Sequence, residues 1–232
     1  MATPILIMGP PGTGKTASIR NLDPAETFLI HADEKPLGLP KSSTNYKTVL
    51  KNNGKLDLQK SNYYETNDPV LIQELLKAIS SNSPHIKTIV LDTLTSVMTN
   101  EYMTRLKEKG FDKYGDFAKD TYDIIKLVRG LRDDLTVVIT AHSEDNYDVE
   151  GELKSSFKVI GGKLVKEKLV PESFFHMVLF TDVVMKDGKP NYYFLTQNNG
   201  KNTCRTPLGL FSEYRIPNDL KYVIEEYKEY EK

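Results

Sequence analysis

Eight residues near the start of the chain have the types and the spacing that bind a phosphate group. Residues 9–16, GPPGTGKT, match the pattern G-x-x-x-x-G-K-[ST] without a mismatch. In this pattern the glycines let backbone N–H groups turn toward an anion, the lysine supplies a cation for the β- and γ-phosphates, and the final hydroxyl binds Mg²⁺. The sequence therefore predicts a site for ATP and Mg²⁺. The predicted nucleotide-binding residues are Gly9, Pro10, Pro11, Gly12, Thr13, Gly14, Lys15, Thr16 and Ala17.

An aspartate closes an apolar run in the middle of the chain. Asp92 ends residues 88–92 and is expected to hold Mg²⁺ together with Thr16; a cap for the following helix is the alternative. In AAA+ enzymes a glutamate normally follows this acid, but here Thr93 follows it. The group that activates the attacking water must therefore lie elsewhere.

Polar residues that follow two further apolar runs are candidates for the remaining chemistry. Asp33 and Glu34 come after residues 27–31, and a carboxylate near the γ-phosphate can deprotonate water. We predict Glu34 as the base and keep Asp33 open, since one residue of register separates them. His142 follows residues 136–140 and is expected to sense the γ-phosphate, with a hydrogen-bonded structural histidine as the alternative.

The elements that must position these residues alternate along the chain. Predicted strands cover residues 4–8, 27–31, 88–92 and 136–140, and apolar residues recur at helical spacing in residues 72–79, 94–109 and 118–131. Such alternation favours a mostly parallel sheet with helices on both faces, in which the carboxyl ends of the strands share one edge. We therefore expect the phosphate-binding loop, the acids and His142 to converge there.

The rest of the chain predicts additions to this core. Residues 174–184 and 191–196 are expected to be strands joined by a turn at residues 186–189, and Asn218 is expected to cap a closing helix. Residues 35–54 are polar and favour a surface excursion, in which residues 46–49 are a candidate short strand.

Composition limits the classes of protein to which the chain can belong. The chain has 232 residues, a net charge of −1, 39% hydrophobic and 27% charged residues, and a single cysteine. These values favour one soluble domain, with a core at residues 1–142 and additions at residues 143–232. A reducing cytoplasm and no membrane association are expected. Since the net charge is near zero, any DNA contact must come from local lysine clusters.

Taken together, the loop at residues 9–16, Asp33 and Glu34, residues 89–93, Ala141-His142 and the closing strands resemble the phage-encoded RecA-core ATPases grouped with single-strand annealing and recombination proteins. The resemblance implies an α/β fold with a RecA-like P-loop core, a mostly parallel sheet and antiparallel strands near the C-terminus. It also implies a phage AAA-type ATP-binding protein that assembles on single-stranded DNA as a homo-oligomer or filament. A single-strand binding protein is a further partner that it suggests.

RecA-like proteins bind DNA through two loops, which the resemblance assigns to the segments after Asp92 and after His142. Both segments contain basic and aromatic residues that can contact phosphates and stack on bases. A solvated basic surface is the alternative for both. The first set is Lys107, Lys109, Phe111 and Lys113, and the second is Lys154, Phe157, Lys158, Lys163 and Lys166.

The phosphate-binding loop provides one cation, Lys15, whereas the transition state of γ-phosphate transfer normally needs another. Lys201 and Arg205 follow the strand at residues 191–196 and resemble in placement the basic residues that RecA-like protomers insert into a neighbour's ATP site. A basic surface turn is the alternative. A second class of function also stays open, in which the ATPase serves protein partners, packaging or replication without touching DNA.

Overall fold

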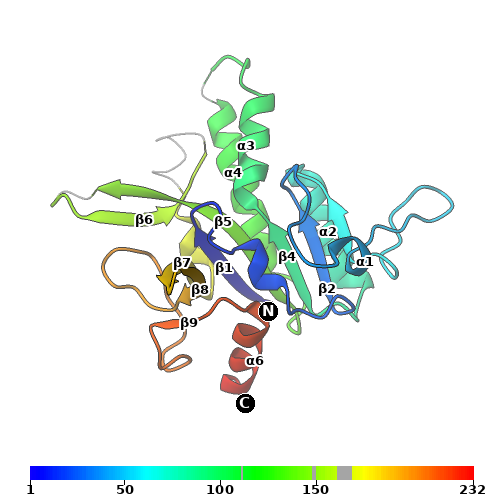
Figure 1. The fold of residues 1–232 in the computed structure, drawn as a ribbon. Coiled ribbons are helices and arrows are strands. Elements are labelled where there is room, and N and C mark those ends of the chain that lie inside the picture. Colours follow the sequence, from blue (N-terminus) through cyan, green and yellow to red (C-terminus); the bar gives the residue numbers. More distant parts are fainter. Residues whose placement is uncertain (111, 148–149, 161–168) are drawn as a thin grey trace.

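A mostly parallel sheet organises the molecule. The structure, a computed structural model, describes residues 1–110, 112–147, 150–160 and 169–232. In this part of the chain nine strands form one sheet in the order β3-β2-β4-β5-β1-β7-β8-β9, with β6 paired to β5 (Figure 1). β3, β2, β4, β5, β1 and β7 run parallel, whereas β6, β8 and β9 pair antiparallel. The predicted fold class is confirmed. The strands are β1 (Thr3–Gly9), β2 (Thr27–His31), β3 (Tyr63–Glu65), β4 (Thr88–Asp92), β5 (Thr136–Tyr147), β6 (Leu153–Phe157), β7 (Met177–Lys186), β8 (Lys189–Leu195) and β9 (Arg215–Pro217).

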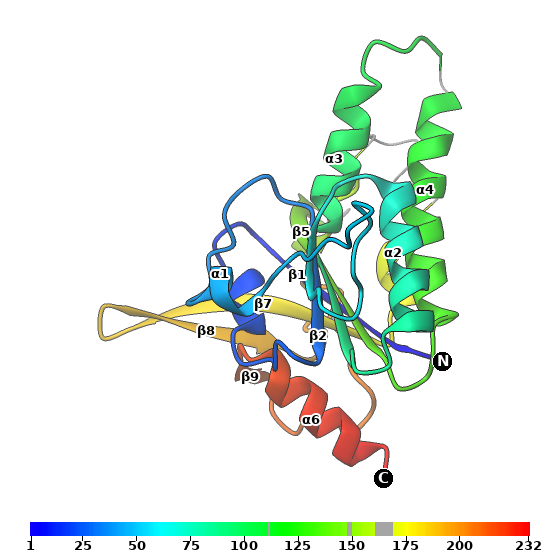
Figure 2. The ribbon, with the colours of Figure 1, turned by 90° about the vertical axis from the view of Figure 1, so that its right-hand side faces the viewer.

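Helices cover both faces of this sheet, which explains why its central strands are apolar throughout. On one face, Leu6 and Met8 of β1 join a core with α2 (Pro69–Asn82), α3 (Leu94–Thr104) and α4 (Asp112–Arg129). On the other face, Ile5 and Ile7 join a core with α6 (Leu220–Tyr230). Figure 2 shows α2, α3 and α4 on one side of the sheet and α6 on the other. Alternate residues of one strand thus build two cores.

Local hydrogen bonds explain where several elements begin and turn. Asp68 caps α2, because its side chain accepts hydrogen bonds from the N–H groups of Val70 and Leu71. The predicted turn between β7 and β8 is present, with positive φ angles of 51° at Asp187 and 71° at Gly188. None of the helices in the described ranges combines the length and the apolar composition that a membrane crossing requires.

Three details of the predicted elements are wrong. Residues 46–49 are not a strand; they follow one helical turn, α1 (Ser42–Asn45), and the Asn62 side chain bonds the backbone of Asn45 and Lys47. The helix predicted at residues 94–109 ends at Thr104, where the Thr104 hydroxyl bonds the carbonyl of Asn100. The cap of α6 is Asp219, whose carboxylate accepts from the N–H of Lys221.

In the described residues three hairpins extend beyond the sheet near its carboxyl edge: α3–α4, β5–β6 and β7–β8 (Figure 1). The helices α3 and α4 rise side by side and project away from the strands (Figures 1 and 2). The β7–β8 hairpin projects on the other flank of β1, because Phe180 already lies beside Met8 and β7 continues to Lys186. The segment that follows β1 therefore lies between two projections.

Candidate active site at the carboxyl ends of the parallel strands

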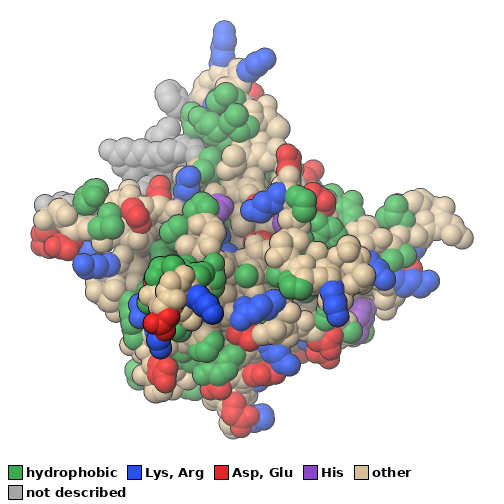
Figure 3. Space-filling view, viewed as in Figure 1, with side chains coloured by type: hydrophobic (Ala, Val, Ile, Leu, Met, Phe, Trp, Pro, Cys, Tyr) green, Lys and Arg blue, Asp and Glu red, His purple; other side chains and the backbone are tan. Residues whose placement is uncertain are grey.

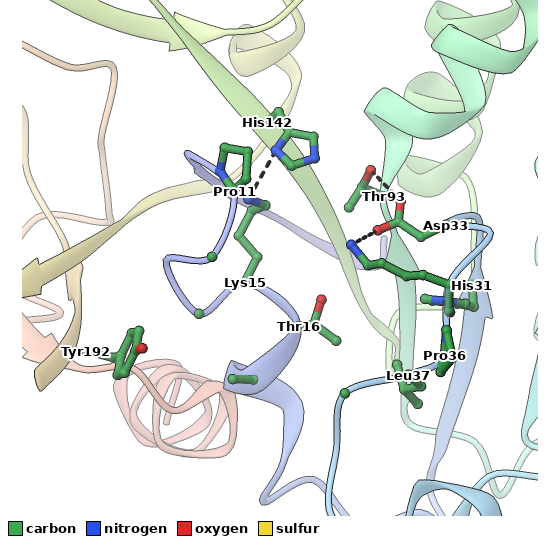
Figure 4. Close-up of a pocket in the computed structure, with 15 residues that line it drawn as sticks. Pro11, Lys15, Thr16, His31, Asp33, Pro36, Leu37, Thr93, His142 and Tyr192 are labelled. Atoms are coloured by element: carbon green, nitrogen blue, oxygen red, sulfur yellow. Dashed lines mark hydrogen bonds and ion pairs between the residues drawn. The ribbon is translucent and has the colours of Figure 1, made fainter. Parts of the chain in front are cut away.

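A cleft of about 420 Å³ opens where β1, β2, β4 and β5 end. It contains most of the phosphate-binding loop together with Asp33 and His142, which come from three different strands (Figure 4). Topology therefore brings together residues that are far apart in the sequence. The residues that line the cleft are Pro11, Gly12, Gly14, Lys15, Thr16, Ala17, His31, Asp33, Lys35, Pro36, Leu37, Gly38, Thr93, His142 and Tyr192.

The phosphate-binding loop leaves β1 at Gly9 and ends in a single 3₁₀ turn, η1 (Thr16–Ile19). A side chain at Gly9 has no room, because a Cβ atom there would lie 1.8 Å from Oγ1 of Thr181 on β7. Thr181 also bonds the loop directly, at 2.5 Å from Oγ1 of Thr13. The loop is thus held against β7 by contacts that only glycine at its first position permits.

Lys15 lies folded over the loop. Its ammonium donates hydrogen bonds of 2.8 Å to the carbonyls of Gly9 and Pro10, and it lies 3.3 Å from Nδ1 of His142. Burial, partly opposed by Asp92, lowers the pKa of Lys15 from its ordinary value to about 8. An anion in the cleft would compete with the two carbonyls for this ammonium.

Asp92 lies beneath the loop and is fully buried. Its Oδ2 accepts a 2.7 Å hydrogen bond from the hydroxyl of Thr16, and its Oδ1 accepts from the hydroxyl of Thr140. Threonine and aspartate oxygens suit Mg²⁺, a hard cation that keeps several of its waters and also binds substrate phosphates. Thr16 and Asp92 are therefore the residues of this site that would hold Mg²⁺. In the described residues no cluster of three or more His, Cys, Asp or Glu side chains offers a further metal site.

The segment that follows β2 separates the two candidate bases. His31, Asp33 and Lys35 line the cleft, whereas Ala32 and Glu34 line a separate groove of about 410 Å³. The chain bends at residues 33–35, where the carbonyl of Lys35 accepts a hydrogen bond from Nε2 of His31, and this bend places Asp33 and Glu34 in different hollows. Asp33, and not the preferred Glu34, therefore lines the nucleotide cleft.

Both oxygens of Asp33 have partners. Oδ1 accepts from the hydroxyl of Ser96 and, at 3.4 Å, from that of Thr93, while Oδ2 lies 2.5 Å from Nζ of Lys35. Burial by itself would raise the pKa of Asp33, but the hydrogen bonds from Lys35 and Ser96 outweigh it and lower the pKa. Glu34, in contrast, is exposed and accepts a 3.2 Å hydrogen bond from Asn67.

His142 links the cleft to the groove, since its side chain lines both. Its backbone N–H donates to Oγ1 of Thr95, and its carbonyl accepts from the N–H of Lys158 on the chain that leaves β6. Burial and the nearby Lys15 ammonium lower the pKa of His142. The ring is therefore neutral at pH 7, and Nδ1 can accept a hydrogen bond from Lys15.

Seven residues that line the cleft were not predicted from the sequence: His31, Lys35, Pro36, Leu37, Gly38, Thr93 and Tyr192. Lys35 gave no periodic signal, because residues 33–35 form a bend and not an extended strand. Thr93 stood out only as a departure from the AAA+ pattern. Tyr192 gave no local signal, since β8 reaches the cleft only through the antiparallel pairing with β7.

Several predicted DNA-binding residues are found in other roles. Lys113 is buried, and its ammonium donates to the carbonyls of Arg105, Leu106 and Glu108 at the end of α3. Phe157 is 2% exposed and belongs to the core, so that it cannot stack on a base. Both assignments are corrected. The remaining described candidates, Lys107, Lys109, Lys154 and Lys158, are exposed, whereas Phe111, Lys163 and Lys166 lie outside the described residues.

The two candidates for insertion into a neighbouring site differ in their contacts. The guanidinium of Arg205 donates to the carbonyls of Glu172 and Phe175, and its backbone pairs with Val178. Arg205 is exposed, but these bonds hold its guanidinium against its own chain and disfavour its insertion into a neighbouring site. Lys201 is exposed.

The chain is similar to one protein family and to solved structures. The model of a family described as an AAA domain matches residues 1–208. Among solved structures, a KaiC-like protein, PH0186 from the hyperthermophilic archaeon Pyrococcus horikoshii OT3, is similar at 13% identity and a TM-score of 0.44, over 83% of this chain and 77% of that chain. No curated protein matches the sequence. Since the family model spans most of the sequence, the chain belongs to this AAA domain family of P-loop proteins.

Proposed function

We propose that the chain hydrolyses Mg²⁺-ATP while it is assembled on single-stranded DNA, where it promotes annealing or homologous recombination. The observation that carries the ATPase part is the hydrogen bond between Thr16 and Asp92 beneath the phosphate-binding loop, with the Lys15 ammonium above it. These groups are the ones that P-loop ATPases use to bind the β- and γ-phosphates and Mg²⁺. Membership of the AAA domain family supports the same activity.

Asp33 is proposed to activate the water. It would accept the proton of a water whose oxygen forms a bond to the γ-phosphorus. The bond from that phosphorus to the β,γ-bridging oxygen breaks, and its electron pair stays with ADP. Mg²⁺, when bound, neutralises charge on the phosphates. Ser96 and Thr93 keep the Asp33 carboxylate aimed at the cleft, and Lys15 stabilises charge on the transferred group.

The link to DNA rests on the connection between His142 and the β5–β6 ribbon. The carbonyl of His142 accepts a 2.9 Å hydrogen bond from the N–H of Lys158, an exposed cation at the end of that ribbon. A strand of DNA held by Lys158 and Lys154 would therefore contact the segment that also carries the γ-phosphate sensor. Lys107 and Lys109, between α3 and α4, provide a second exposed pair, and Figure 3 shows Lys or Arg side chains at the tip of this hairpin. Copies of the chain would then line up along one strand.

One observation favours the alternative of an ATPase that serves protein partners. Met103 and Leu106, at the end of α3, are 59% and 49% exposed, and an apolar patch is visible below the tip of the hairpin in Figure 3. Contiguous exposed apolar patches are typical of sites of protein contact. Packaging and replication accessories are the functions in this class.

Binding of fluorescent oligo-dT with and without a non-hydrolysable ATP analogue separates the two. We expect the analogue to strengthen binding. The double variants Lys107→Ala/Lys109→Ala and Lys154→Ala/Lys158→Ala should each lower the salt slope, by about one for each lysine that binds a phosphate. The matched control is Lys47→Ala/Lys51→Ala, which removes two exposed lysines from the excursion between β2 and β3. Absence of oligo-dT binding in the presence of the analogue would contradict the DNA-binding proposal and favour the alternative.

A further inference from the structure

Two cations line the nucleotide cleft in the described part of the chain, and only Lys15 belongs to the phosphate-binding loop. The other is Lys35, which follows β2. Its ammonium lies 2.5 Å from Oδ2 of Asp33, and its side chain is 63% exposed whereas that of Asp33 is 7% exposed. The ion pair therefore joins a fixed inner carboxylate to an outer ammonium on a long and largely solvated side chain.

The backbone of Lys35 is held by a hydrogen bond to β2, while its side chain is largely exposed and held at its end by the ion pair with Asp33. The carbonyl of Lys35 accepts a 2.9 Å hydrogen bond from Nε2 of His31, a fully buried ring on β2. His31 pairs in register with Asp92, beneath the phosphate-binding loop. The backbone of Lys35 is thus held near the base of the site. Rotation about the bonds of its four methylene groups can turn the ammonium toward a nucleotide.

We infer that Lys35 is the second cation of the ATP site and acts in cis, moving from Asp33 to the γ-phosphate when the nucleotide binds. This inference rests on the proposed ATP hydrolysis. It supplies the charge that the sequence led us to expect from a neighbouring protomer. Arg205, one candidate for that role, is bonded to the carbonyls of Glu172 and Phe175 of its own chain.

The move of Lys35 would have two effects on the reaction. At the γ-phosphate the ammonium offsets the negative charge carried by the phosphoryl oxygens in the transition state. At Asp33 it frees Oδ2, while Oδ1 remains bonded to Ser96 and Thr93. The carboxylate is then both oriented and available to take the proton of the attacking water. In the empty site the same ion pair keeps the base occupied.

Affinity for a transition-state analogue tests this role without relying on turnover. Wild type and Lys35→Ala are titrated with Mg²⁺-ADP alone and with Mg²⁺-ADP plus aluminium fluoride. We expect Lys35→Ala to keep ADP affinity within about twofold and to lose about 10²-fold in affinity for the fluoride complex, because added transition-state cations are worth about 10³-fold or more in related enzymes. Lys35→Arg should recover part of the loss. Lys51→Ala, an exposed lysine on the same excursion, should behave as wild type.

Asp33→Asn separates direct contact from a positioning role. If Lys35 contacts the γ-phosphate directly, Lys35→Ala loses affinity for the Mg²⁺-ADP–aluminium fluoride complex, whereas Asp33→Asn keeps most of that affinity. Equal losses in the two variants, or an unchanged affinity in Lys35→Ala, would overturn the inference. Mixing Lys35→Ala with Lys15→Ala tests the cis assignment: regained ATPase activity would show that Lys35 acts on a neighbour's site. A wild-type chain that neither binds nor hydrolyses ATP would instead refute the proposed function itself.

Discussion

The protonation of Lys15 makes the affinity for ATP depend on pH in a range where lysines normally do not titrate. Burial lowers the pKa of Lys15 to about 8 in the empty cleft. Only the ammonium form attracts phosphate, and a bound polyphosphate stabilises that form. Raising the pH through 8 therefore removes the proton from the free protein, so that ATP binding must take one up. The affinity should fall as the pH rises.

The size of the effect follows from that pKa. At pH 7 about nine-tenths of the Lys15 side chains are protonated, and at pH 9 about one-tenth are, so the apparent Kd for Mg²⁺-ATP should rise about tenfold, or about 1.4 kcal/mol. The pKa of His142 lies below its usual value, so its ring stays neutral from pH 7 to pH 9. Glu101 on α3 is a second group that titrates in this pH range, because burial and the nearby Asp120 raise its pKa to about 8.

Calorimetric titration at pH 7, 8 and 9 measures both the affinity and the proton uptake, the latter by comparing buffers of different ionisation enthalpy. Lys15→Arg is the matched control, since a guanidinium stays charged at pH 9 and its profile should be flat if it binds. Glu101→Gln should keep the wild-type dependence. A wild-type Kd that is unchanged between pH 7 and 9, or a rise of the same size in Lys15→Arg, would refute the reasoning.

Three further outcomes are expected. Asp33→Asn should lower kcat by about 10²-fold or more with ATP affinity retained, whereas Glu34→Gln should stay within about twofold; steady-state kinetics that reverse this order would return the base to Glu34. Gly9→Ala should destabilise the fold by about 1–3 kcal/mol in denaturant titrations because its Cβ would meet Thr181, and Gly38→Ala, with nothing within 4 Å and no left-handed φ, should cost less; equal losses would contradict the packing at Gly9. Arg205→Ala should lower Tm, because the carbonyl of Phe175 loses its guanidinium donor and that of Glu172 keeps only the N–H of Phe175, and the variant should hydrolyse ATP at the wild-type rate on its own; a loss of activity that mixing with Lys15→Ala restores would revive the inserted-residue hypothesis.

The parts of the site that could be predicted are those that local sequence determines. The loop at residues 9–16 carries its own pattern, and Asp92 ends a strand whose five residues are all buried. An apolar run of this kind is typical of a buried parallel strand, so its final acid is expected at the carboxyl edge of the sheet. The contact between Thr16 and Asp92 follows from these two facts and the parallel arrangement of the strands.

The register of β2 could not be predicted, because this strand is also buried along its whole length. Because Thr27 to His31 are buried on both faces, the strand has no alternation of polar and apolar residues from which the direction of Asp33 or Glu34 could be derived. Phe157 was misassigned for a related reason. Its burial depends on β5 pairing and on Glu172, fifteen positions later, whose carboxylate accepts from its backbone N–H. Such contacts are long-range, and no window of sequence contains them.

The central claim is that the cleft around Lys15 binds and hydrolyses ATP. Release of inorganic phosphate from Mg²⁺-ATP by wild type and Lys15→Ala tests it most directly, with circular dichroism melting to show that both chains are folded. Turnover by wild type and its loss in Lys15→Ala are the predicted results. Phosphate release at the wild-type rate by a folded Lys15→Ala chain would contradict the claim.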